Sequence, residues 1–135
     1  MTYALSTTVD LSFDEALAAT REALADNGFG VLTEIDLAAT LKQKIDADIA
    51  PQVILGACRP PLALAALQAE PGIGLLLPCN VVVRADETGA TTVDAVDAAT
   101  MVELTANPAL QPVADDARAR LEAALASLAP TRTDS

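Results

Sequence analysis

The sequence predicts a single α+β domain of two layers, in which helices pack on one face of a mixed, mostly antiparallel sheet. Three observations favour this fold class. Short stretches with strand patterns alternate with short stretches with helix patterns along most of the chain. Two strand-like stretches late in the chain are joined by a glycine-containing turn, as in a hairpin. The length of 135 residues suits one domain with its own core.

The chain begins with a strand pattern followed by a clear helix start. Residues Tyr3–Val9 alternate in character, as in a half-buried strand. Ser12 and Glu15 have the spacing of a capping box, and Gly28 can end the helix that the box opens. The same kinds of signal predict the later elements, which are the strand Phe29–Ile35, the helix Leu37–Ile45 capped by Asp36, the strand Gln52–Cys58, the helix Leu62–Ala69, the strands Cys79–Ala85 and Thr91–Val96, a helical piece Ala98–Leu104 and a last helix from Pro112.

Two aliphatic stretches, Val53–Pro61 and Leu75–Arg84, organise the rest of the chain. Each joins a run of aliphatic residues to a cysteine close to a proline. A continuous apolar run is typical of a strand that is covered on both faces. We therefore expect two buried strands that lie side by side in the middle of the sheet. Residues Ile73–Leu77, just before the second strand, fit either a turn or a lead-in to that strand.

Composition and charge exclude several partners. The net charge is −11 and the pI is near 4.1, so phosphate backbones and anionic membrane surfaces would be repelled. Only 2% of the residues are aromatic, which argues against base stacking. We expect no nucleic-acid partner and no membrane partner, and we interpret the acidity as a solubility property. The N-terminus lacks the pattern of a signal peptide, which predicts a cytoplasmic protein with free thiols.

The chain contains no histidine, which removes histidine-based triads and every histidine-containing metal site. It contains two cysteines, Cys58 and Cys79, at or near the ends of the two central strands. One interpretation is a thiol pair for redox chemistry or for a soft metal such as Cu(I) or Zn(II), with Arg59 or Arg84 lowering a thiol pKa. The other, which we favour, is that both are small buried hydrophobic residues. No resident cofactor is expected.

Polar residues on the predicted strands are the remaining site candidates. Glu34 and Asp36 share one strand face, and Asn80 and Arg84 share a face of another strand. A polar pocket would form if these faces met; otherwise the charged residues form ion pairs on a sheet face, and Asp36 caps a helix. An enzyme that uses Glu34 or Asp36 is the weakest hypothesis, because the sequence shows no pairing of a nucleophile with a base.

Three ordered blocks resemble the domain-of-unknown-function family numbered 302. They are Gly28–Asp36, Leu55–Pro60 and Leu76–Val83, and with the helix between them the resemblance covers roughly Tyr3–Met101. It implies a small cytoplasmic α+β domain, a homodimer and no established activity. One departure is Arg59, since such proteins usually have asparagine after the first cysteine, and a ligand that touches this position would differ accordingly.

We therefore expect one domain, with a family-like core over residues 1–106, a C-terminal helix over 112–129 and a frayed tail over 130–135. The first functional hypothesis is a non-enzymatic homodimeric module that binds a small molecule near the two cysteine stretches. The alternative is a cytoplasmic thiol or soft-metal protein that uses both cysteines. The candidate ligand-binding residues are Glu34, Cys58, Arg59, Cys79, Asn80 and Arg84.

Overall fold

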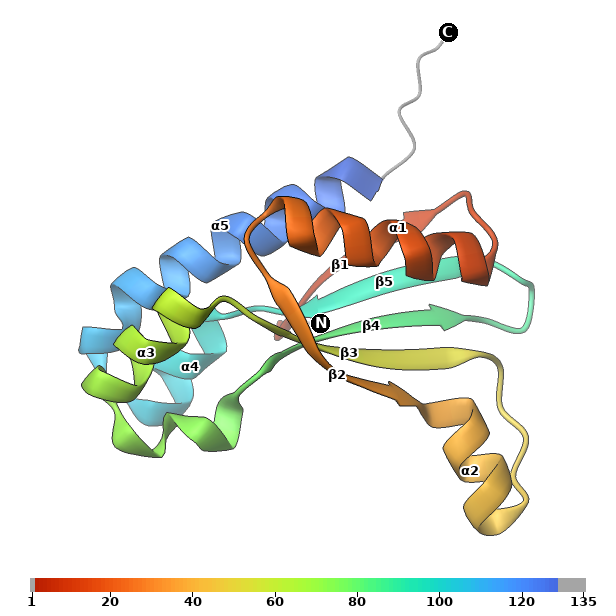
Figure 1. Ribbon diagram of the computed structural model, residues 1–135, viewed down its shortest axis with the longest axis horizontal. Helices are drawn as coiled ribbons and strands as arrows, with labels where there is room; N and C mark the ends of the chain where they lie inside the picture. The colour runs from red at the N-terminus through yellow and green to blue at the C-terminus, as the bar shows by residue number, and fades with distance from the viewer. Residues whose placement is uncertain (1, 129–135) are drawn as a thin grey trace, which may run out of the picture.

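The computed structural model describes residues 2–128 and contains one five-stranded sheet with helices packed around it (Figure 1). No helix among these residues is both long and apolar enough to cross a bilayer. The elements in chain order are β1 (Ala4–Val9), α1 (Phe13–Asp26), β2 (Gly30–Asp36), α2 (Leu37–Ile45), β3 (Gln52–Cys58), α3 (Pro60–Ala69), the 3₁₀ helix η1 (Pro71–Leu76), β4 (Cys79–Ala85), β5 (Thr91–Val96), α4 (Ala99–Thr105), the 3₁₀ helix η2 (Pro108–Leu110) and α5 (Gln111–Leu128).

The predicted fold class is confirmed. The strand order is β1-β5-β4-β3-β2, and each neighbouring pair is antiparallel. The helix α1 carries the chain from one edge strand to the other, whereas α2 and the α3–η1 segment are excursions between strands that pair directly. The two aliphatic stretches form β3 and β4, which are neighbours in the interior of the sheet as expected.

Local signals placed the element ends well. Both bonds of the predicted capping box are present at the start of α1, where Ser12 accepts from the Glu15 amide and Glu15 accepts from the Ser12 amide. Asp36 caps α2, and its carboxylate accepts from the Ala39 amide at 3.0 Å. The ambiguous Ile73–Leu77 segment largely belongs to η1, a 3₁₀ helix that starts at Pro71. The predicted tail, 130–135, lies outside the described residues.

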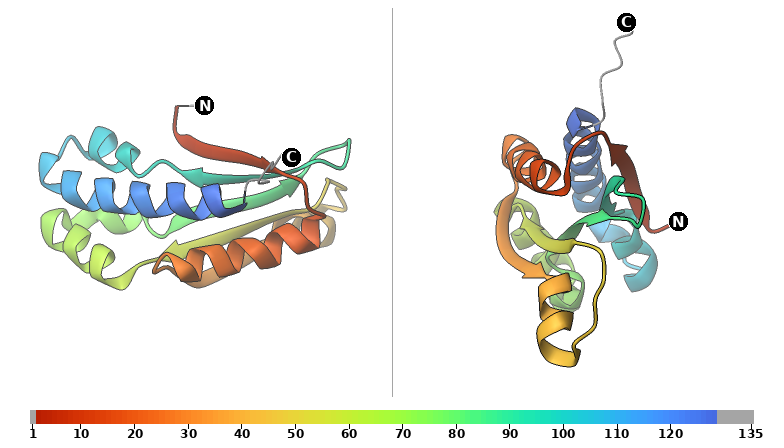
Figure 2. Two further views of the ribbon diagram at one scale, coloured as in Figure 1. Left: turned by 90° about the horizontal axis from the view of Figure 1, so that it is seen from above. Right: turned by 90° about the vertical axis from the view of Figure 1, so that its right-hand side faces the viewer.

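The helices α1 and α5 lie side by side across one face of the sheet (Figures 1 and 2). The main core forms between them and alternate strand residues, among which Leu55 and Val83 are fully buried. A second, smaller core lies at the end of the sheet where β3 ends and β4 begins, and it is built from α3, η1, α4 and the first half of α5. Ile73 and Leu110 are fully buried in this second core.

The expectation that both central strands are covered on both faces is wrong for the single chain. In β3 the inward residues Val53 and Leu55 are buried, while Ile54 between them is only half-buried. In β4 the same alternation leaves Val82 half-buried. The opposite face of the sheet carries no helix layer within residues 2–128, and α2 projects away from it beyond one edge (Figure 2). We refer to this face as the open face.

Candidate functional site

The two cysteine stretches meet at one end of the central strands. The antiparallel register of β3 and β4 pairs Ala57 with Cys79, so Cys58 lies one residue beyond that pair, where the chain turns into α3. Both cysteines are free, and both line a small cavity between this end of the sheet and the second core. The structure therefore brings together two of the residues that the sequence singled out, as their strand positions predicted.

The small cavity has a volume of about 20 Å³ and is almost entirely apolar. A space of this size accommodates about one water molecule or one methyl group. Its walls come from β3, β4 and three helices, and they include Arg59 as the only charged residue among those described. The full lining is Phe29, Ala57, Cys58, Arg59, Leu62, Ala63, Ala66, Leu77, Cys79, Met101, Val113 and Ala117.

The environment of Cys79 makes it a poor nucleophile. Its residue is only 7% exposed, and this burial raises the pKa of the Cys79 thiol to about 11, with a further contribution from nearby Cys58. The thiolate is the reactive form of cysteine, and a thiol with this pKa stays protonated at neutral pH. Cys79 thus lacks the lowered thiol pKa that the redox interpretation required.

A larger cavity of about 430 Å³ lies on the other side of Cys79. Cys79 and Met101 line both this cavity and the small one, so the two spaces adjoin at these two side chains. The remaining walls are largely apolar and include the exposed residues Tyr3 and Leu104, with Glu103 as a single carboxylate. A volume of 430 Å³ falls within the range of ligand pockets, which is about 300–1,000 Å³.

The structure places Asn80 and Arg84 elsewhere. Both point to the open face, because they alternate with the buried residues Val81 and Val83 along β4. The Arg84 Nε donates to the Asp94 carboxylate on β5 at 2.8 Å. That carboxylate also accepts from Ser6 on β1. Asn80 and Arg84 line a groove of this face that shares Tyr3 and Val96 with the larger cavity, but neither Asn80 nor Arg84 lines the cavities beside Cys79 and Met101.

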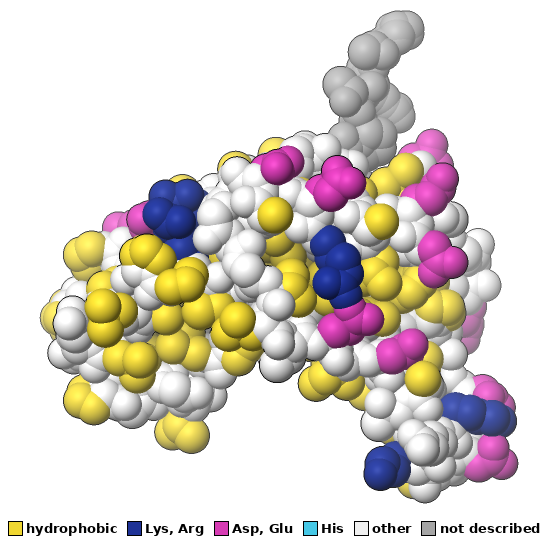
Figure 3. All heavy atoms as spheres, in the orientation of Figure 1, with side chains coloured by type: hydrophobic (Ala, Val, Ile, Leu, Met, Phe, Trp, Pro, Cys, Tyr) yellow, Lys and Arg dark blue, Asp and Glu magenta, His cyan; other side chains and the backbone are white. Residues whose placement is uncertain are grey.

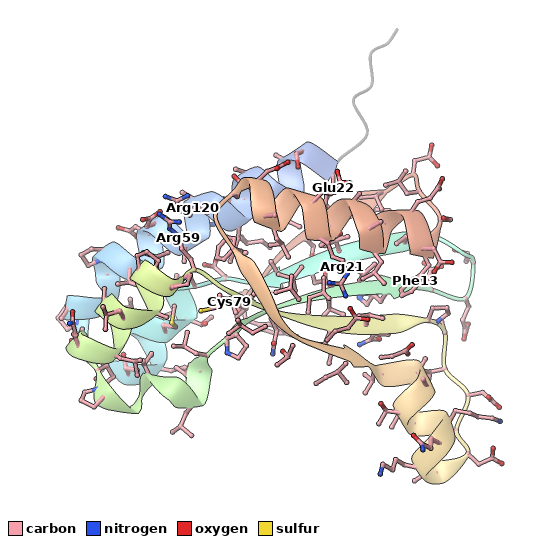
Figure 4. All side chains as sticks on the ribbon, in the orientation of Figure 1. Phe13, Arg21, Glu22, Arg59, Cys79 and Arg120 are labelled. Carbon is pink, nitrogen blue, oxygen red and sulfur yellow. The ribbon has the colours of Figure 1, made fainter. Side chains whose placement is uncertain are left out.

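Glu34 lies apart from both groups. A β-bulge between Val31 and Thr33 shifts the register of β2, and Glu34 pairs in the ladder with Leu55 on the face that the helices cover. Its carboxylate forms an ion pair with Arg21 of α1, which lies above this edge of the sheet (Figure 4). The polar pocket that would join Glu34 to Arg84 does not form, since each residue has a different partner on a different face.

Sequence reasoning missed several residues that build the site. Met101 was expected only as part of a helical piece, and Arg120 lies on the last helix, beyond the recognised blocks. Figure 4 shows Arg120 beside Arg59, above the end of the sheet that holds Cys79. Helical periodicity would place Met101 on the buried face of α4, but no sequence signal reports which strand end that face meets.

The chain belongs to the family described as domain of unknown function DUF302, whose model matches residues 5–128. The match extends through α5, beyond the three blocks that carried the resemblance. Among solved structures, the chain is similar to an uncharacterised conserved DUF302 protein from Bacillus stearothermophilus. The sequences are 29% identical, the TM-score is 0.87, and the alignment covers 95% of this chain and 99% of that one. No curated protein matches the chain.

Proposed function

We propose that this protein is a non-enzymatic module that binds a small, mainly apolar molecule in the larger cavity beside Cys79 and Met101. The cavity itself carries the proposal, because a space of about 430 Å³ with largely apolar walls has the size and character of sites that bind small molecules. The walls offer few polar groups and no activated nucleophile, which supports binding over catalysis.

The test uses decan-1-ol as a neutral apolar probe. We expect a saturable shift of the Met101 methyl signal in NMR titration of the wild-type protein, because Met101 lines the cavity. Thr100→Phe, which places a ring at the cavity wall, should abolish the shift. Ala119→Phe, at an exposed position of α5, is the matched control and should bind as wild type. A wild-type protein that shows no saturable shift contradicts the proposal.

Soft-metal binding is the alternative function. One observation strengthens it: the structure adds a third sulfur to the two cysteines that the sequence indicated. Met101 adds a thioether to the two thiols of the small cavity, and sulfur ligands are those that Cu(I) prefers. Within residues 2–128, no cluster of three or more cysteine and carboxylate ligands accompanies them. A titration with Cu(I) separates the two functions: stoichiometric uptake that Met101→Leu weakens would support the alternative, and two independently reacting thiols without uptake would dispose of it.

The protein is further proposed to act as a homodimer that pairs through the open face. Ile35, Ile54 and Val82 lie in register across β2, β3 and β4 on this face, and Ile45 at the end of α2 is 67% exposed. The apolar runs of β3 and β4 are typical of strands that are covered on both faces. A second copy of the chain covers the open face, as the helices cover the other. Both lysines of the chain lie on α2; Lys42 already pairs with Asp46 and Asp48, so Lys44 is the one that favours contact with an acidic second copy.

Sedimentation at micromolar concentration tests the dimer. We expect wild-type protein to sediment as a dimer and Val82→Asp to sediment as a monomer, because a carboxylate buried in an apolar interface is strongly unfavourable. Ala119→Asp is the control, since Ala119 is exposed on α5, in the helix layer on the other side of the sheet from the open face. A wild-type monomer at this concentration, or a Val82→Asp dimer, contradicts this arrangement.

A further inference from the structure

Two arginines lie side by side at the mouth of the small cavity. The Nη1 atom of Arg59 lies 2.6 Å, and that of Arg120 3.2 Å, from the position that a Cβ would take at Gly28. Two guanidinium groups are therefore close neighbours, although they come from segments far apart in the sequence. Figure 4 shows them together above α3, and Figure 3 shows the basic cluster at the margin of a broad hydrophobic surface.

The positive charge of this pair is only partly compensated. Arg120 donates from Nε to the Asp116 carboxylate at 2.7 Å and from Nη1 to the Asn27 carbonyl at 3.1 Å. The Nε atom of Arg59 is buried without a hydrogen-bond partner, and no ion pair of Arg59 occurs among the residues that the structure describes. A buried donor without a partner is costly, so an accepting group is needed at this point.

The carbonyl end of α1 explains why an arginine lies here, but it does not account for both. Positive side chains are stabilised at a helix C-terminus, and Arg120 already bonds to the Asn27 carbonyl there. Arg59 is the first residue before α3 and makes no side-chain cap of that helix. The second guanidinium thus remains next to a like charge, in a protein whose net charge is −11.

We infer that Arg59 and Arg120 bind the carboxylate of an amphiphilic acid whose chain enters the cavities beneath them. Arg59, Arg120 and Asp116 together carry one net positive charge. A carboxylate monoanion neutralises this charge, whereas a phosphate dianion would leave one negative charge in excess. A guanidinium also matches a carboxylate with two parallel hydrogen bonds. This inference rests on the proposed function, because the apolar chain of the ligand would bind in the larger cavity. The binding of its carboxylate depends only on the two arginines.

The position of Arg59 connects the anion site to the cavities. Arg59 lines the small cavity together with Met101, which also lines the larger one. Met side chains are unbranched and rotate easily, so a chain that displaces Met101 would run from the arginines into the 430 Å³ space. The ligand class is then a medium-chain carboxylic acid with its head at Arg59 and its tail beside Leu104.

The experiment compares decanoate with decan-1-ol, measured by calorimetry on the full chain. Wild-type protein should bind decanoate at least about tenfold more tightly than Arg59→Gln does, because a charge-assisted hydrogen bond is lost. Decan-1-ol should bind both proteins equally. Arg118→Gln is the matched control, an arginine of α5 close in sequence to Arg120, since Arg118 pairs with Asp97 and Glu122 and lines neither cavity. It should bind decanoate as wild type does.

The outcomes separate this inference from the proposed function. Equal decanoate affinity in wild type and Arg59→Gln overturns the anion site, and the apolar cavity stands if decan-1-ol still binds. Failure of decan-1-ol to bind overturns the proposed function instead. Titration with acetate then reports on the arginines alone: a saturable shift of the Arg120 Nε–H signal that Arg59→Gln weakens supports the anion site, and no shift in the wild-type protein overturns it.

Discussion

The two faces of the sheet differ in what covers them, although the same two strands supply both. On the covered face, Val53, Leu55 and Val83 are buried under α1 and α5. On the open face, Ile54 and Val82 alternate with these residues and remain half-buried beside polar neighbours. An aliphatic run thus specifies a strand with two apolar faces, and the rest of the chain determines whether helices pack on both of them.

The largest expected effect comes from truncating one residue on each face. Leu55→Ala should lower the free energy of unfolding by about 2–5 kcal/mol, because Leu55 is fully buried and its loss leaves a cavity. Ile54→Ala should cost the monomer about 1 kcal/mol or less, since part of its surface is already in water. Urea unfolding at low protein concentration measures both. Equal losses would mean that the open face is as well packed as the covered one.

The second prediction concerns the pH dependence of stability through Cys79, at the end of the covered face. Burial raises the pKa of this thiol from the ordinary value of 9.0 to about 11, so the folded protein holds the proton after the unfolded chain has lost it. The free energy of unfolding should therefore fall as the pH rises from 9.0 to about 11, by up to roughly 3 kcal/mol. Stability is unaffected by this group below the unfolded pKa.

Cys79→Ala should remove this fall in the free energy of unfolding at alkaline pH. Cys58→Ala, at the half-exposed cysteine, should keep most of it. Chemical unfolding of the three proteins at several alkaline pH values provides the measurement. An unchanged slope in Cys79→Ala would show that the loss of stability comes from other groups.

The smallest expected effect is that of the ion pair between Arg84 and Asp94 on the open face. The arginine side chain is 39% exposed and that of the aspartate 17%, and partly exposed pairs contribute about 0–1 kcal/mol. A double-mutant cycle with Arg84→Gln and Asp94→Asn measures the coupling at low and at micromolar protein concentration. A coupling well above 1 kcal/mol only at the higher concentration would show that a second copy buries this pair, and that the open face is covered in the dimer.

Much of the candidate site could be predicted from its two strands, and the rest could not. The positions of Cys58 and Cys79 at the ends of β3 and β4 correctly indicated that they lie close together. Of the two outcomes weighed for Glu34 and Arg84, the separate ion pairs formed and the shared polar pocket did not, because the two side chains lie on opposite faces of the sheet. Strand periodicity gives two faces but does not say which face meets the helices.

The class of fold, the element ends and the family could be predicted from local patterns, because capping residues, turn glycines and apolar periodicity act over a few neighbouring residues. The set of side chains that share a cavity follows only from the way the helices pack on the sheet. Met101 and Arg120 reach the cysteine end of the sheet through helices that follow it by at least twenty residues. Such contacts depend on how the helices pack over the strand ends, and no local pattern encodes that packing.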